Sequence, residues 1–75
     1  MQVRIKLMGT LQPKSPEGGT LQVPEGATVE AVLRLLEISS GGIQVFLING
    51  SPKRDLSHQL EADDELTVLG PVGGG

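Results

Sequence analysis

Three segments of the chain alternate between polar and apolar residues, which is the pattern of a β-strand with one buried face. They are residues 2–8 (QVRIKLM), 20–23 (TLQV) and 65–69 (ELTVL). A fourth segment, residues 43–48 (IQVFLI), is apolar on both parities except at Gln44. Because this run is short and rich in β-branched side chains, it favours a strand over a helix.

An amphipathic helix is predicted between the second and third of these strands. Thr28 stands where an N-cap belongs, and Glu30 places a negative charge near the positive end of the helix dipole. Residues 39–42 (SSGG) are expected to end the helix and to supply a glycine for a left-handed C-cap. The apolar stripe at helical spacing is formed by Val29, Val32, Leu33 and Leu36.

The segments between these elements carry turn signals. Residues 9–19 are rich in glycine, proline and polar residues, and they predict a loop. The Asn49-Gly50 pair predicts a tight turn. Residues 52–55 (PKRD) are expected to form a short polar edge segment, and Leu56 and Leu60 are expected to pack beneath a turn or one coil of 3-10 helix.

The order of these elements is strand, strand, helix, strand, short strand, strand. This order predicts an α+β domain in which one mixed sheet of four to five strands has the helix packed on one face. The first and last strands would lie side by side and parallel in the middle, which is the β-grasp (ubiquitin-like) arrangement. We expect a β-grasp domain over residues 1–69 and a flexible C-terminal glycine tail over residues 70–75.

Composition and charge narrow the function. The net charge is −3 and the isoelectric point is near 4.9, so the chain lacks the basic surface that nucleic-acid binding requires. It has no cysteine, which excludes disulfides and thiolate metal sites. No apolar run approaches the length of a membrane span, and the first residues lack the apolar core of a signal peptide. We therefore expect a cytoplasmic protein, monomeric when free, that binds neither nucleic acid nor membrane.

No combination of residue types indicates a catalytic or metal site. His58 is the only histidine, and its simplest interpretation is an exposed turn residue. The acidic run 61–65 lacks the calcium-loop pattern, so a solvated turn is favoured, with steering of a basic partner as a further possibility. The glycine pair 41–42 follows the helix, whereas a phosphate-binding loop precedes one. We predict no catalytic residue, no metal ligand and no bound cofactor.

The third long strand offers two candidate docking faces. Phe46 and Ile48 share one face, and Val45 and Leu47 share the other. Both faces cannot pack on a single helix, so one of them is either covered by loops or exposed as an apolar patch for a partner. The sequence leaves open which face this is.

The last residues are LGPVGGG, and the final three are glycines without side chains. Frayed flexibility is the simplest interpretation of such an end. Glycines without Cβ atoms can also pass through a narrow channel and approach another protein's backbone closely. A carboxylate carried on such a tether can be presented to a distant active site, and this is a chemical use for the tail.

Five stretches follow one another in the order of a known family. They are residues 23–29 (VPEGATV), 43–50 (IQVFLING), 58–60 (HQL), 64–66 (DEL) and 71–75 (PVGGG). Together they resemble the ubiquitin-like sulfur carriers, which include the small subunit of molybdopterin synthase and the sulfur carrier of thiamin synthesis. The likeness spans nearly the whole chain and is weakest in the loop 9–19.

The resemblance implies a carrier on which other enzymes act, rather than an enzyme. An E1-like adenylating enzyme would use ATP to activate the terminal carboxylate, and sulfur would then replace one oxygen to give a thiocarboxylate. Gly75 would bear the sulfur, while Gly73 and Gly74 would thread through the partner's active site. A larger synthase subunit, or another sulfur acceptor enzyme, would receive the sulfur for cofactor biosynthesis. Docking is expected at Phe46, Leu47, Ile48, Pro71 and Val72.

Two departures from the family pattern bear on the subfamily. Residues 68–71 (VLGP) stand where molybdopterin-type tails carry two aromatic residues and two prolines, yet Pro71-Val72 favours that type over the thiamin type. Asp63 stands where the family often has glycine, and aspartate tolerates a left-handed turn better than most residues. Two alternatives stay open: a ubiquitin-like modifier joined through Gly75 to lysines, and a non-covalent β-grasp interaction module.

Overall fold

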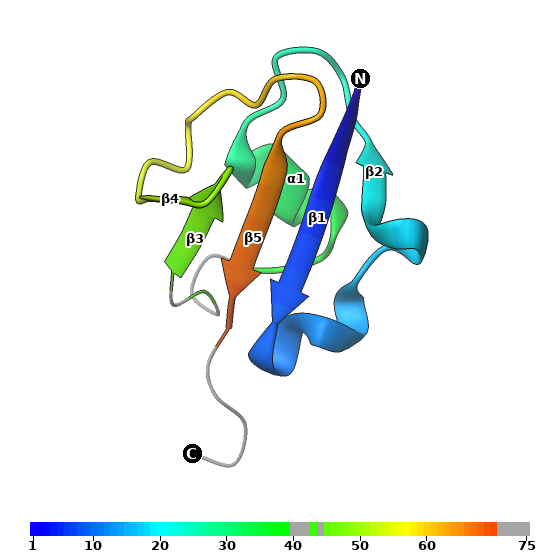
Figure 1. The fold of residues 1–75 in the computed structure, drawn as a ribbon, viewed down its shortest axis with the longest axis vertical. Coiled ribbons are helices and arrows are strands. Elements are labelled where there is room, and N and C mark those ends of the chain that lie inside the picture. The colour runs from blue at the N-terminus through cyan, green and yellow to red at the C-terminus, as the bar shows by residue number, and fades with distance from the viewer. Residues whose placement is uncertain (40–42, 44, 71–75) are drawn as a thin grey trace.

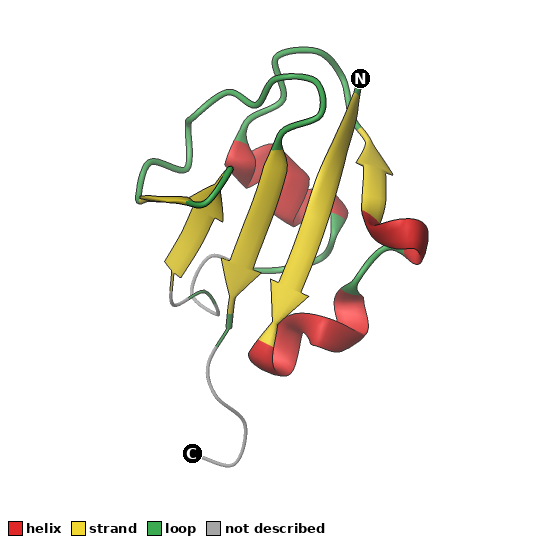
Figure 2. Ribbon diagram, in the orientation of Figure 1, coloured by secondary structure: helices red, strands yellow, loops and turns green. Residues whose placement is uncertain are grey.

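The computed structural model describes residues 1–39, 43 and 45–70. A mixed sheet with one α-helix behind it makes up this part of the chain (Figures 1 and 2). Two short 3-10 helices, η1 and η2, fill the connection between the first two strands. The elements in chain order are β1 Gln2–Met8, η1 Gly9–Lys14, η2 Glu17–Gly19, β2 Thr20–Gln22, α1 Val29–Leu35, β3 Val45–Ile48, β4 Ser51–Lys53 and β5 Glu65–Leu69.

The sheet has the order β2-β1-β5-β3-β4. Its two central strands, β1 and β5, are the first and last in the sequence, and they run parallel from the Arg4–Glu65 pair to the Met8–Leu69 pair. The β1–β2, β3–β4 and β3–β5 pairs are antiparallel. The predicted mixed sheet, in which the first and last strands of the sequence lie at the centre, is confirmed.

The core lies between the sheet and α1, as the alternating pattern predicts. Inward residues of the long strands are buried while their neighbours are not: the burial of β1 alternates strictly along its whole length. The predicted helical stripe also faces the core. The side chains that are 2% exposed or less are Val3, Val29, Val32, Leu33, Leu60, Leu66 and Val68.

The start of α1 is as predicted, but its end is not. The Thr28 hydroxyl accepts a hydrogen bond from the Ala31 amide at 3.2 Å, which confirms the N-cap. The helix ends at Leu35, and Glu37 takes the left-handed conformation at φ 60°. The expectation that a glycine of residues 39–42 closes the helix is therefore wrong, because the reversal comes before them and brings the Ile38 amide onto the Leu33 carbonyl at 2.8 Å. Gly41 and Gly42 lie outside the described residues.

The connections are more ordered than the turn signals suggest. The predicted loop 9–19 contains η1 and η2, and Leu11 of η1 is buried. The edge segment predicted at residues 52–55 is β4, one residue earlier, and all of its side chains are exposed. Leu60 is buried at 2% exposure, and its amide donates to the Ala27 carbonyl at 2.8 Å.

Two predicted turns are confirmed by positive φ angles. Asn49 and Gly50 have φ angles of 51° and 84°, which suits the hairpin between β3 and β4. Asp63 has a φ of 65°, so aspartate does hold a left-handed turn conformation at this position, as expected from its residue type.

The packing of α1 against the sheet can be tested by comparing two leucines of this helix, one buried and one exposed. Leu33 is 2% exposed beneath the sheet, whereas Leu35 on the same helix is 57% exposed. We expect Leu33→Ala to lower the free energy of unfolding by about 2–5 kcal/mol, because it leaves a cavity in a small core. Leu35→Ala should change it by less than about 0.5 kcal/mol, since alanine is a good helix former and the site is exposed. Urea denaturation measures both, and equal losses for the two variants would contradict this packing.

Candidate functional site

Among the described residues, none forms a helix on the face of the sheet opposite α1 (Figure 1). Its residues are the outward members of each strand, and the strand register arranges them in rows. The row nearest the C-terminal end of β5 is apolar: Met8 on β1 pairs with Leu69 on β5, which pairs with Val45 on β3. Met8 is 42% exposed, and Leu69 and Val45 are half-buried. We call these three residues the exit row.

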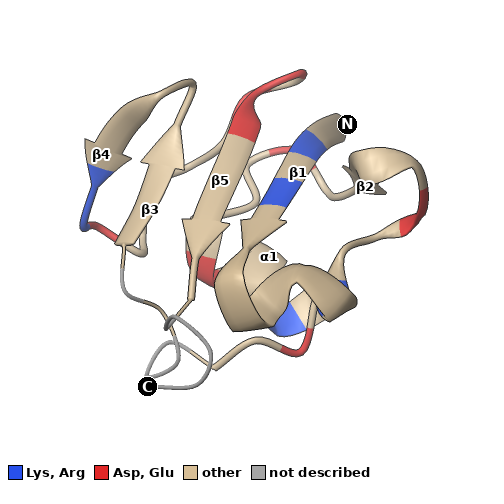
Figure 3. Cartoon of the chain, turned by 60° about the horizontal axis from the view of Figure 1, so that its bottom comes forward, with Lys and Arg blue, Asp and Glu red and all other residues tan. Residues whose placement is uncertain are grey.

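The next rows become more polar away from the exit row. The second row joins Lys6, Thr67 and Leu47, with Pro52 of β4 beyond Leu47. Farther along, Arg4 pairs with Glu65. Figure 3 shows this gradient: Lys and Arg colour β1 and an acidic residue colours the start of β5, while the strand ends beside the grey C-terminal trace carry no charge.

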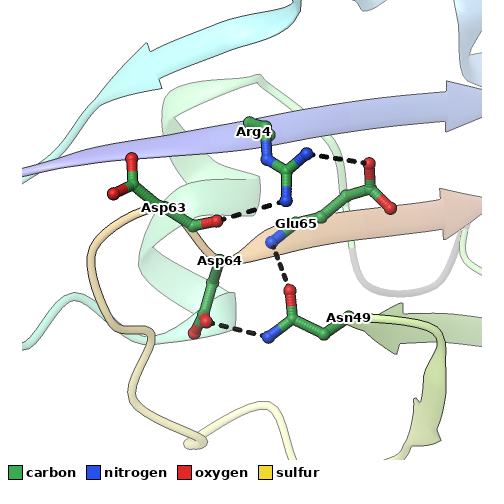
Figure 4. Close-up of polar contacts among 5 residues, drawn as sticks. All are labelled: Arg4, Asn49, Asp63, Asp64 and Glu65. Carbon is green, nitrogen blue, oxygen red and sulfur yellow. Dashed lines mark hydrogen bonds and ion pairs between the residues drawn. The ribbon is translucent and has the colours of Figure 1, made fainter.

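The charged end of the face is held by a hydrogen-bond network (Figure 4). The Asn49 amide donates through Nδ2 to the Asp64 carboxylate at 2.9 Å and accepts through Oδ1 from the Glu65 amide at 2.9 Å. Arg4 lies 3.9 Å from Glu65 and donates to the Asp63 carbonyl at 3.5 Å. Such an exposed ion pair contributes little stability by itself. The network's effect is to fasten the β3–β4 turn and the acidic turn to the sheet.

Gly70 is the last described residue, and it belongs to the folded domain. It is buried, and its amide donates to the Met8 carbonyl at 3.2 Å. The sequence analysis places Gly70 in the tail, but this bond continues the pairing of β5 with β1 by one residue. The remaining tail residues, Pro71, Val72, Gly73, Gly74 and Gly75, lie outside the described residues.

The structure separates the two candidate docking faces. Phe46 and Ile48 are 4% and 6% exposed and face α1, so the prediction that they dock a partner is wrong. Their side chains are core residues, because the sheet needs apolar groups against the helix. Val45 and Leu47 are half-buried on the open face. Leu47 therefore stays a candidate docking residue.

His58 lies in the connection between β4 and β5, away from the exit row. Its carbonyl accepts from the Val29 amide at 3.0 Å, which ties this connection to the start of α1. Next to it, Ser57 donates through its hydroxyl at 2.6 Å and its amide at 3.0 Å to Asp55. These bonds, with the nearby His58 charge, hold the pKa of Asp55 below its ordinary value. Among the residues that the structure describes, no three His, Cys, Asp or Glu side chains form a group that could hold a metal ion.

The sequence did not predict that the three residues of the exit row lie side by side. Met8 and Leu69 each interrupt a run of polar residues at the outward positions of their strands: Gln2, Arg4 and Lys6 precede Met8, and Glu65 and Thr67 precede Leu69. An apolar residue on the polar parity at the end of both strands was the available signal. It becomes meaningful only when the parallel register makes the two residues neighbours.

A comparison with protein families matches residues 5–75 to the ThiS family. The chain belongs to the ThiS family. This places it among the ubiquitin-like sulfur carriers, as the motif order predicts. A search of curated proteins gives no significant match.

Solved structures support the same fold. The chain is 25% identical to SAMP1 from Haloferax volcanii, with a TM-score of 0.71 and full coverage of both chains. It is 18% identical to the putative molybdopterin converting factor subunit 1 from Pyrococcus furiosus, with a TM-score of 0.74, covering 96% of this chain and 99% of that one. It is 19% identical to a chain in the complex of molybdopterin-converting factor subunits 1 and 2 from Helicobacter pylori, with a TM-score of 0.62 and full coverage of both. These matches confirm the β-grasp fold.

Membership of this family also bears on the kind of activity to expect. Proteins of this kind are small subunits or carriers that other proteins act upon. None of the helices within residues 1–39, 43 and 45–70 is long and apolar enough to cross a membrane.

Proposed function

We propose that this ThiS-family protein carries sulfur on its terminal glycine. The Gly75 carboxylate is adenylated by an E1-like enzyme and converted to a thiocarboxylate, which donates its sulfur to cofactor biosynthesis. The observation that carries this proposal is the family match, which extends through the glycine tail to residue 75.

The chemistry explains why a carrier needs no catalytic groups of its own. A carboxylate is a poor electrophile, so its oxygen first attacks the α-phosphate of ATP and pyrophosphate leaves. A sulfur nucleophile then attacks the acyl carbon, and AMP leaves with the oxygen. Both steps take place in the partner's active site, which has to stabilise the developing charge. The carrier has to dock and deliver one carboxylate.

The open face supports this division of work. The exit row lies where β5 ends, so a partner that binds these side chains also receives the residues that follow Gly70. Leu47 extends the apolar surface by one row. Apolar contacts at the centre and charged residues at the margin are the usual arrangement of a protein interface. We therefore assign docking to the exit row and Leu47, with Pro71 and Val72 continuing it and Gly73 and Gly74 threading into the partner.

We favour molybdopterin synthesis as the pathway. Pro71-Val72 resembles the tails of molybdopterin-type carriers, and two of the similar structures are molybdopterin converting factor subunits. The structure from H. pylori is a complex of subunits 1 and 2, which supports a larger synthase subunit as the second partner after the adenylating enzyme.

A protein modifier is the second candidate function. SAMP1 from H. volcanii is described as a small archaeal modifier protein, and it is 25% identical to this chain over its full length. In that case the activated Gly75 carboxylate would form an isopeptide bond with a lysine amine of another protein. The same adenylation step serves both functions, so the acceptor distinguishes them.

The sulfur carrier function predicts a change of mass. We expect incubation with ATP, sulfide and the cognate adenylating enzyme to replace one oxygen by sulfur, as read by intact-protein mass spectrometry. Deletion of Gly75 should abolish the gain without changing the thermal unfolding midpoint, because the described core ends at Gly70. If the mass of the wild-type chain stays unchanged with a confirmed cognate enzyme, the proposal is wrong.

The docking surface predicts a loss of affinity at one position of the open face. Leu47→Arg should weaken binding to the adenylating enzyme by at least about tenfold, because it places a charge in the apolar part of the interface. Gln22→Arg is the matched control: Gln22 is exposed and pairs with Gln2 at the far edge of the sheet. Isothermal titration calorimetry measures both variants. Equal affinities would remove Leu47 from the interface.

The modifier function predicts a specific remnant on acceptor lysines. The last lysine or arginine before the tail is Arg54, so trypsin leaves a long branch instead of a short Gly-Gly mark. A glutamate-specific protease cuts after Glu65 and leaves residues 66–75 on the acceptor. We expect this branch in digests of cells that express the protein if it is a modifier. Its absence, in cells where the thiocarboxylate is found, assigns the protein to sulfur transfer alone.

A further inference from the structure

The residue at position 70 is restricted by space and not by backbone conformation. A Cβ atom on Gly70 would lie 2.7 Å from Leu11 Cγ, 3.1 Å from Leu11 Cδ1 and 3.2 Å from Thr10 Oγ1. The described glycines with positive φ are Gly9, Gly18, Gly19, Gly26 and Gly50, and Gly70 is not one of them. An alanine could therefore adopt its backbone angles, but the side chain of Leu11 occupies the place of the methyl group.

Leu11 cannot yield this space easily. It is 7% exposed and belongs to the hydrophobic core. The closest atom is Cγ, the branch point of the side chain, so a change of its terminal rotamer does not remove the contact. The segment that carries it is also held: Lys14 donates to the Glu37 carbonyl at 3.0 Å, and Ser15 donates through its hydroxyl and its amide to the Gln12 carbonyl at 2.7 and 3.0 Å.

Gly70 is therefore confined on two sides. Its amide is bonded to the Met8 carbonyl at the end of β1, and Leu11 and Thr10 of η1 close over its Cα. All three partners belong to one continuous segment, residues 8–11, which leaves β1 and folds back over the exit of β5. This segment fixes the position of the last described residue relative to the exit row.

We infer that Leu11 is a positioning residue, which packs against Gly70 so that the tail leaves β5 in one direction relative to the docking face. This inference rests on the sulfur carrier function proposed above. Five residues follow Gly70, and they reach at most about 17 Å when extended. When such an arm is held extended in the partner's active site, a change of direction at its base moves its end by several ångströms, and misplacement of a reacting group by about 1 Å can cost about a hundredfold in rate.

The test compares kcat and KM for adenylation in four proteins: wild type, Gly70→Ala, Leu11→Ala and the double variant. We expect Gly70→Ala to lower kcat about tenfold and to leave KM within about twofold, because the exit row is intact while the carboxylate is misdirected. Leu11→Ala should lower kcat in the same way. The double variant should recover part of the kcat lost in Gly70→Ala, because the alanine methyl then occupies the space that Leu11 has left.

A structural control separates positioning from general destabilisation. Leu60 is also a buried leucine, at 2% exposure, but it packs beside Ala27 at the start of α1. Leu60→Ala should lower the unfolding midpoint as Leu11→Ala does and keep the wild-type kcat at temperatures where both are folded. If Leu60→Ala and Leu11→Ala slow adenylation equally, or if Gly70→Ala keeps the wild-type kcat, the positioning role is overturned. If Leu11→Ala fails to fold, Gly70→Ala still decides the question when its kcat is measured at temperatures where it is folded.

Hydrogen exchange tests the contact between Leu11 and Gly70 without any enzyme. The Gly70 amide, bonded to the Met8 carbonyl, should lose protection in Leu11→Ala and Gly70→Ala but keep it in Leu60→Ala. If the wild-type chain gains no sulfur, the carrier function is wrong. The exchange pattern then still shows whether Leu11 holds Gly70 in place. Equal protection of the Gly70 amide in all variants overturns the inference.

Discussion

The parallel pairing of β1 with β5 is the constraint on which the rest of the structure depends. Parallel strands need a long crossover, and here the crossover contains α1 and the strands β2, β3 and β4. The pairing places the first and last strands at the centre of the sheet, and their C-terminal ends lie side by side. Because Met8 then lies beside Leu69, the apolar exit row, the η1 segment and the base of the tail all meet at this end of the two strands.

The helix α1 covers one face of the sheet, and this leaves the proposed docking surface on the other face. The buried side of the sheet uses every inward residue of β1, β3 and β5 to pack against α1. The other side has to remain in water, so it is polar where β1 and β5 begin and apolar only where they end. On this face, the exposed apolar side chains thereby gather at the exit row and at Leu47 beside it.

Local patterns predicted most of this fold because each strand and the helix carry a clear period. Thr28, the Asn49-Gly50 turn and the left-handed Asp63 were all readable from residue type alone. The parity of β3 was not readable, since Phe46 and Leu47 are both apolar and only the position of the helix decides between them. The packing of Leu11 over Gly70 was not readable either, because it joins residues nearly sixty positions apart through a segment that carries only turn signals.

The central position of β5 also decides how the domain responds to a mechanical load. A partner that drew the tail into its active site, as proposed above, would pull along the axis of β5, which is hydrogen-bonded to β1 on one side and to β3 on the other. Such a pull shears both ladders at once, so several bonds have to break together. An edge strand such as β4 would instead peel away one bond at a time. The carrier can thus be held by its end while its fold stays intact.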